Sequence, residues 1–172
     1  MDIVDRLTGH DLWFTSRLIE TAATLPDEAL DKPVLKDMPL LFGSHPITTR
    51  EILASMVANK ERWTATVKGV AVDPPERDTV GNMRDRLKIF GGEFEKLAKD
   101  IDRRGAWDEG FVDVGCDPPI STTYGGMLAH VINFSTYRRN LAILALRELG
   151  VPEDNLGLGD PAEYEREVNG AA

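Results

Sequence analysis

The chain has 172 residues, a length that suits one domain with a proper hydrophobic core. Its net charge of -9 repels phosphate backbones and no cluster of Lys and Arg offsets it locally, so nucleic acid is excluded as a partner. The one cysteine, Cys116, lacks a second thiol, and no apolar run is long enough for a signal peptide or a membrane span. The expectation is a single cytoplasmic domain over residues 1–172, with no membrane as partner.

The first predicted helix covers residues 2–25, where apolar side chains recur at spacings of three, four and seven, beginning with Ile3 and Leu7. A proline stops it, and the link that follows holds four prolines and no sustained period. We expect one short helical turn there, near residues 27–30. His45, at the end of this link, is expected to face solvent or to cap the next helix.

The second predicted helix covers residues 49–68. It opens with Thr48 and Glu51, the spacing of a capping box in which each side chain bonds the backbone of the other residue. Ile52, Met56 and Trp63 keep one face apolar.

The third predicted helix covers residues 80–102 and follows Thr79, a suitable N-cap. It contains Gly91 and Gly92, which disfavour helix by roughly 1 kcal/mol each relative to Ala. We therefore expect a close helix crossing or a local kink at this pair.

Residues 103–120 are rich in glycine and proline and are predicted to be a loop, because their one alternating piece has no evident partner strand. A fourth helix over residues 122–149 follows, and the tail is expected to form a last turn at 161–166. Four long helices with one apolar stripe each can hide those stripes together only as a bundle. The predicted fold class is all-α, a four-helix bundle with long inter-helix loops.

Three stretches, "HDLWFTSRLIETAATLPDEAL", "TTREILASMVANKERW" and "GGMLAHVINFSTYRRNLAILALRELGV", together resemble the DinB family of the DinB/YfiT-like superfamily of four-helix bundles. On the fourth helix the family usually reads His-x-x-Asn-His-x-x-x-His-Arg-Gly-Gln, and His130, Asn133 and Arg139 match it in register. The resemblance implies a helix order other than plain up-down-up-down, permitted by the long links at 26–47 and 103–121. It also implies a homodimer.

Many relatives hold a divalent metal with three histidines, one on the second helix and two on the fourth, and some activate a thiol with it. In this sequence the matching positions carry Ser55, Phe134 and Arg138. Phenylalanine offers no donor and a guanidinium repels a cation, so the resemblance implies a lost metal site and no cofactor. We expect these residues to fill the site, with Arg138 paired to an acid such as Asp11, Glu20 or Glu61.

Two interpretations of function follow. The first is a non-catalytic binding or structural protein with a small pocket at Ser55, His130, Phe134 and Arg138 that takes a small anionic ligand. In it, His130 is a hydrogen-bonded residue of the bundle rather than a ligand. The second is a metal-dependent thiol transferase, isomerase or hydrolase whose displaced metal is held by His130 and His10 with a carboxylate such as Asp11.

Overall fold

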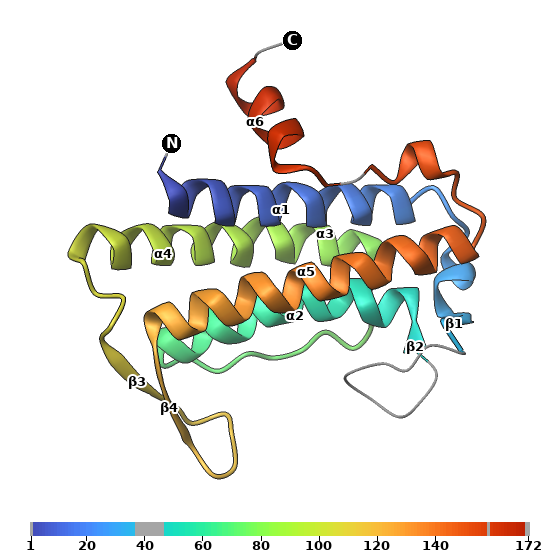
Figure 1. Ribbon diagram of the computed structural model, residues 1–172. Helices are drawn as coiled ribbons and strands as arrows, with labels where there is room; N and C mark the ends of the chain where they lie inside the picture. Colours follow the sequence, from blue (N-terminus) through green and yellow to red (C-terminus); the bar gives the residue numbers. More distant parts are fainter. Residues whose placement is uncertain (1, 37–46, 158, 171–172) are drawn as a thin grey trace.

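The computed structural model describes residues 2–36, 47–157 and 159–170, and there the chain is mostly helical (Figure 1), which confirms the all-α prediction. His45 lies outside the described residues. The long helices are α1 (Ile3–Ala22), α2 (Thr49–Lys68) and α5 (Tyr124–Glu148). A fourth rod joins α3 (Val80–Arg86) to α4 (Gly92–Arg104) through a π-helical turn, Leu87–Gly91. No helix of the described chain is both long and apolar enough to span a membrane.

The helix ends lie close to their predicted positions because the capping signals act as expected. The Thr48 side chain accepts from the Glu51 backbone N–H, and the Glu51 carboxylate accepts from the Thr48 N–H at 2.8 Å. Thr79 and Thr123 cap α3 and α5 in the same way. At the other end of α2, Gly69 takes the left-handed backbone conformation, with φ 65°, that stops the helix.

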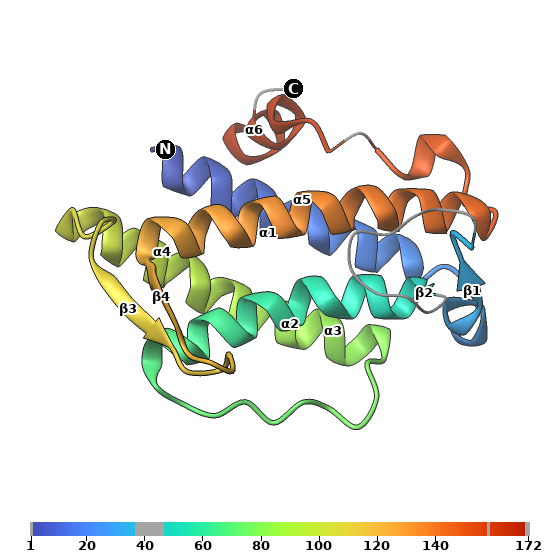
Figure 2. The same cartoon turned by 60° about the horizontal axis from the view of Figure 1, so that its bottom comes forward.

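Ion pairs between the rods show how they run. Glu61 of α2 forms an ion pair with Arg86, and Lys68, about two turns further along α2, forms one with Glu93. Residue numbers therefore rise in the same direction on both, so α2 and the α3–α4 rod run parallel. The link of residues 69–79 therefore runs back beside α2 to the start of α3 (Figure 2). The helix order is therefore not plain up-down-up-down, as expected. The connection that permits it is the 69–79 link rather than the links at 26–47 and 103–121, each of which joins antiparallel rods.

The other two rods, α1 and α5, run antiparallel to α2 and to the α3–α4 rod. Glu20 and Arg84 form one ion pair between α1 and α3, and Asp5 and Lys99 form another between α1 and α4, which makes the two rods antiparallel. α5 runs antiparallel to α2, since Lys60 lies against Ser135 and Trp63, further along α2, lies against His130, earlier on α5. In Figure 1, α1 and α5 accordingly point the same way.

Two short hairpins interrupt the helices. β1 (Pro33–Val34) pairs with β2 (Ile47–Thr48), and β3 (Gly110–Asp113) pairs with β4 (Ile120–Thr123), both antiparallel. The loop prediction for residues 103–120 is therefore wrong. The alternating piece does have a partner, but that partner is a polar segment with no alternation of its own.

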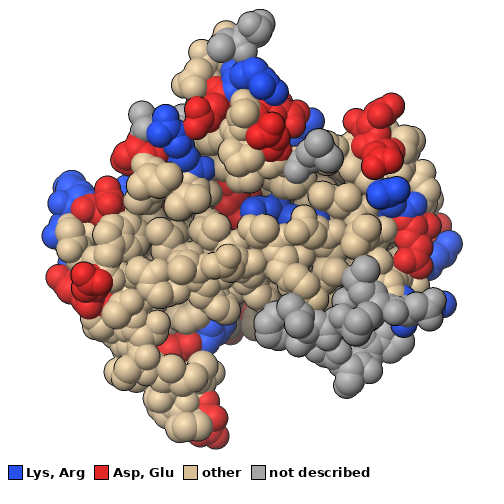
Figure 3. All heavy atoms as spheres, viewed as in Figure 1, with Lys and Arg blue, Asp and Glu red and all other residues tan. Residues whose placement is uncertain are grey.

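Two apolar clusters fill the space between the rods. The larger contains Leu18, Ile52 and Leu146, and the smaller contains Trp63 and Val131. α2, the α3–α4 rod and α5 each contribute one part of their length to the larger cluster and the other part to the smaller one. Ile3 and Leu7, expected in the core, are 64% and 39% exposed because the buried face of this part of α1 carries Val4, Thr8 and Asp11 instead. On the face shown in Figure 3, acidic and basic side chains gather around the ends of the body and over the C-terminal segment.

The glycine pair of the third predicted helix marks the close crossing that was expected. A Cβ on Gly91 would lie 2.5 Å from Leu12 Cδ2 of α1, closer than carbon atoms can approach. The π-helical turn ends at this same residue. A Cβ on Gly92 would meet nothing within 4 Å, so only Gly91 of the pair is closely approached by α1, through the Leu12 side chain.

The last helix, α6 (Pro161–Asn169), extends the turn predicted at residues 161–166 and packs on α1. Arg17 of α1 forms ion pairs with Glu163 and Glu167, at 2.9 and 3.0 Å. Tyr164 is buried at this contact. The C-terminal segment is thus fixed to the outside of the body.

Candidate functional site

Three of the four residues predicted to line a pocket lie in a row along α5. The ring centres of His130 and Phe134 are 5.8 Å apart with the ring planes 22° from parallel. The guanidinium carbon of Arg138 lies 5.2 Å from the Phe134 ring centre and 5.9 Å from that of Tyr137. Residues four apart stack on a helix surface, so α5 alone fixes this order.

The row continues onto α2. The Trp63 ring centre is 5.4 Å from that of His130, and the guanidinium carbon of Arg62 is 4.6 Å from the Trp63 ring centre. We call Arg62, Trp63, His130, Phe134 and Arg138 the cation–aromatic row. Both ends are guanidinium groups over aromatic rings, the geometry of a favourable cation–π contact.

Ser55 is half-buried on α2, and its hydroxyl donates to the Ile52 carbonyl of its own helix at 2.6 Å. The antiparallel register that sets Trp63 against His130 brings Ser55, two turns earlier, level with the Arg138 turn of α5. The structure thus places Ser55 beside the row rather than within it.

The surroundings of the row disfavour added positive charge. Burial and the nearby Arg62 guanidinium lower the pKa of His130 below its ordinary value. Burial likewise lowers the pKa of Arg138, a residue that is 9% exposed. His130 is an exposed residue whose ring lies edge-on to Trp63 and stacks on Phe134. Its predicted hydrogen bond within the bundle stays a prediction.

A second group of polar residues, absent from the sequence-based expectations, lies inside the body between the two apolar clusters. Lys60 is fully buried, and its ammonium donates to Asp11 Oδ2 at 2.8 Å, Ser135 Oγ at 3.1 Å and the Met56 carbonyl at 3.3 Å. Arg139 donates to the other oxygen of Asp11. We call Asp11, Lys60, Ser135 and Arg139 the polar layer.

The sequence did carry a signal for the polar layer. Lys60 occupies the position between Met56 and Trp63 in the apolar stripe of α2, where a core side chain is due. A lysine in such a place requires a buried acid. Asp11 supplies it from α1.

Each of the three acids considered for Arg138 forms an ion pair with another basic side chain. Asp11 binds Lys60 and Arg139, Glu20 binds Arg84, and Glu61 binds Arg86. A carboxylate partner for Arg138 stays a prediction.

The residues of the alternative metal site have separate surroundings. The His10 Nε2 lies 2.6 Å from the Gly159 carbonyl, and its ring packs among Trp13, Phe14 and Tyr164. His130 belongs to the cation–aromatic row, and Asp11 is held by two cations of the polar layer. Within residues 2–36, 47–157 and 159–170, no group of three or more His, Cys, Asp or Glu side chains is arranged to hold a metal ion.

Cys116 lies beside a buried acid near one end of the row. Its thiol donates to Asp113 Oδ2 at 3.4 Å, and Arg62 binds the same oxygen. Burial alone would raise the pKa of Asp113, but hydrogen bonds from the Gly115 N–H, Arg62 and Cys116 lower it below the ordinary value. Arg62 is thereby fixed between the hairpin and the Trp63 ring.

With this geometry in place, the chain was compared with protein-family models, with curated proteins and with solved structures. None of them matches. The residues of the row and of the polar layer therefore carry any inference about function.

Proposed function

We propose that the chain is a DinB/YfiT-like four-helix bundle in which Ser55, Phe134 and Arg138 replace the three metal-binding histidines, and that it is a non-catalytic binding or structural protein. The observation that supports this best is the contact between Arg138 and Phe134, because both positions of the expected ligand pair are engaged with each other. The parallel course of α2 and the α3–α4 rod fits the helix order that the resemblance implies.

The chemistry of the row opposes a divalent cation. Phe134 has no donor atom, and the guanidinium groups of Arg62 and Arg138 at the two ends of the row repel positive charge. The Arg138 guanidinium, with the exposed His130 imidazole further along the row, suits a small anionic ligand such as a carboxylate, whereas Arg62 is already paired with Asp113. We further propose that the protein is cytoplasmic and forms a homodimer.

Metal analysis tests this function. Protein produced without an affinity tag in medium supplemented with zinc and nickel should contain far less than one metal ion per chain after gel filtration. One tightly held zinc or nickel ion per chain would contradict the proposal and revive a metal-dependent activity.

The anionic ligand is tested separately, by titrating benzoate while the His130 ring signals are followed by NMR. A saturable shift is expected in the parent and in Lys96→Gln, an exposed lysine on α4. Arg138→Gln should lose it. A shift that is equal in all three proteins, or absent from the parent, would refute anion binding at the row.

A further inference from the structure

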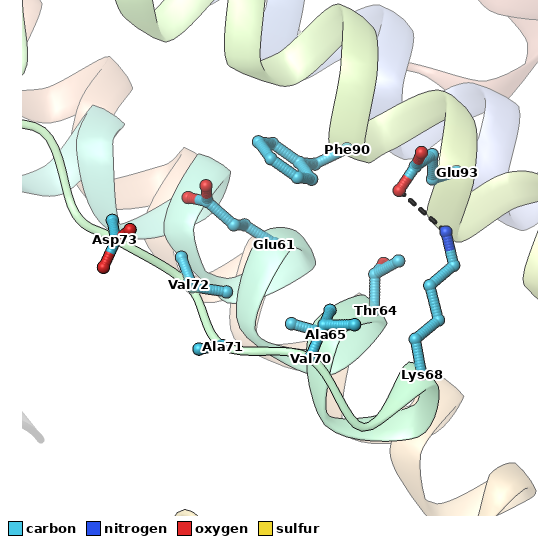
Figure 4. A pocket seen from close by; sticks show the side chains of 10 residues that line it. All are labelled: Glu61, Thr64, Ala65, Lys68, Val70, Ala71, Val72, Asp73, Phe90 and Glu93. Atoms are coloured by element: carbon cyan, nitrogen blue, oxygen red, sulfur yellow. Dashed lines mark hydrogen bonds and ion pairs between the residues drawn. The ribbon is translucent and has the colours of Figure 1, made fainter.

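A cavity of about 160 Å³ lies on the side of α2 that faces the α3–α4 rod, away from the cation–aromatic row (Figure 4). α2 supplies its floor, the beginning of the 69–79 link supplies one wall, and Phe90 and Glu93 supply the other. Figure 4 shows the Thr64 side chain rising from α2 between those of Glu61 and Lys68. Neither the row nor the polar layer uses this space.

Thr64 is 1% exposed, and its hydroxyl has no hydrogen-bond partner among the described residues. Several threonines inside the helices of this chain bond the carbonyl four residues earlier, as Thr8, Thr15 and Thr136 do at 2.7–2.8 Å. A buried hydroxyl left unbonded costs free energy, so its orientation toward the cavity needs a reason. A polar group of a ligand supplies one.

The charges of the lining select the sign of that polar group. The lining contains three carboxylates, of Glu61, Asp73 and Glu93, and one ammonium, that of Lys68. Lys68 is held by Glu93 at 2.8 Å on the rim, and Glu61 is held from behind by Arg86. With Glu61 paired to Arg86 and Glu93 paired to Lys68, the carboxylate of Asp73 is in excess, so the cavity carries a net negative charge that attracts a cation and repels an anion.

The remaining walls are apolar. Val70, Ala71 and Val72 of the link lie across from Phe90. An aromatic ring face adds a favourable contact for a cation and for an apolar body alike.

We propose that this cavity binds a small organic ammonium ion with an apolar body. The ammonium donates to the Thr64 hydroxyl and to the carboxylates, and the body packs between Phe90 and Val72. The site is independent of the proposed function at the row.

Titration of ¹⁵N-labelled protein with benzylamine tests this site. Saturable shifts are expected at the amides of Val72 and Phe90. Benzyl alcohol, which keeps the shape without the charge, should bind more weakly, and benzoate should leave these two amides unchanged.

Two variants and one control sharpen the result. Thr64→Val keeps the shape and removes the hydroxyl, so it should weaken benzylamine binding roughly 2- to 10-fold, the worth of one hydrogen bond. Thr66→Val makes the same change on the same helix outside the cavity and should bind as the parent does. Ala71→Phe, at an exposed link position, should fill the cavity and abolish the shifts while leaving the protein folded.

Any of three outcomes would overturn the site: no saturable shift with benzylamine, equal affinity for benzylamine and benzoate, or undiminished binding in a folded Ala71→Phe protein. Equal weakening by Thr64→Val and Thr66→Val would overturn the role of the Thr64 hydroxyl.

Discussion

The charges of the polar layer predict that replacing its acid, Asp11, costs more stability than replacing its lysine, Lys60. Among the described residues it joins two cations, Lys60 and Arg139, to the single carboxylate of Asp11. Asp11→Asn would leave two buried positive charges beside each other, a loss of about 3–5 kcal/mol from the free energy of unfolding. Lys60→Met would leave a neutral pair of Asp11 with Arg139.

The cost of Lys60→Met should therefore be smaller. A hydrogen bond between charged groups is worth about 1.5–3 kcal/mol, and the apolar methionine side chain, which suits the adjacent clusters, offsets part of that loss. We expect a net loss of about 1–2 kcal/mol, clearly below that of Asp11→Asn.

Urea unfolding at pH 7, followed by far-ultraviolet circular dichroism, measures both values. Lys96→Met serves as the matched control, because this exposed lysine of α4 should change stability by less than about 0.5 kcal/mol. If Lys60→Met costs as much as Asp11→Asn or more, the described charges do not form a layer with one positive charge in excess, and the reasoning fails.

Three further predictions concern the crossing and the row. Gly91→Ala should destabilise by about 1–3 kcal/mol because its Cβ collides with α1, whereas Gly92→Ala should stabilise by about 0.5–1 kcal/mol; equal effects in urea unfolding would refute the close crossing. His130 should titrate by NMR below the ordinary pKa of 6.5, so the stability it contributes is present above that pH and lost as the pH falls, and Arg62→Gln should raise its pKa; a fall would refute the assignment. Arg138→Met should destabilise by more than about 0.5 kcal/mol in urea unfolding, since a smaller change is typical of surface positions and would end the account of a filled site.

Helix positions could be predicted from the sequence because local signals set them. Thr48, Thr79 and Thr123 each bond the first turn of a helix, and such capping depends on neighbouring residues alone. The β3–β4 hairpin could not be found this way. Its second strand, Ile120–Thr123, has no periodicity and is defined only by pairing with the first.

For the cation–aromatic row, the contacts within α5 could be predicted from the sequence, whereas the contacts between α5 and α2 could not. Phe134 and Arg138 stack as their spacing requires. Their alignment with Trp63 depends on how α2 crosses α5, which no single stretch of sequence encodes. The choice of Asp11 as the partner of Lys60 and Arg139 likewise depends on the rotation of α1 in the assembled body.

The most direct test of the central proposal, that Ser55, Phe134 and Arg138 occupy the positions of a three-histidine metal site, places histidines at these three positions. Ser55→His, Phe134→His and Arg138→His together should create a site for zinc or nickel whose affinity falls below about pH 6 as the imidazoles protonate. Isothermal titration with zinc should give one ion per folded triple variant, with much weaker binding in the parent and in each single variant. A folded triple variant that binds no better than the single variants would show that the three positions do not converge, and would contradict descent of this face from a metal site.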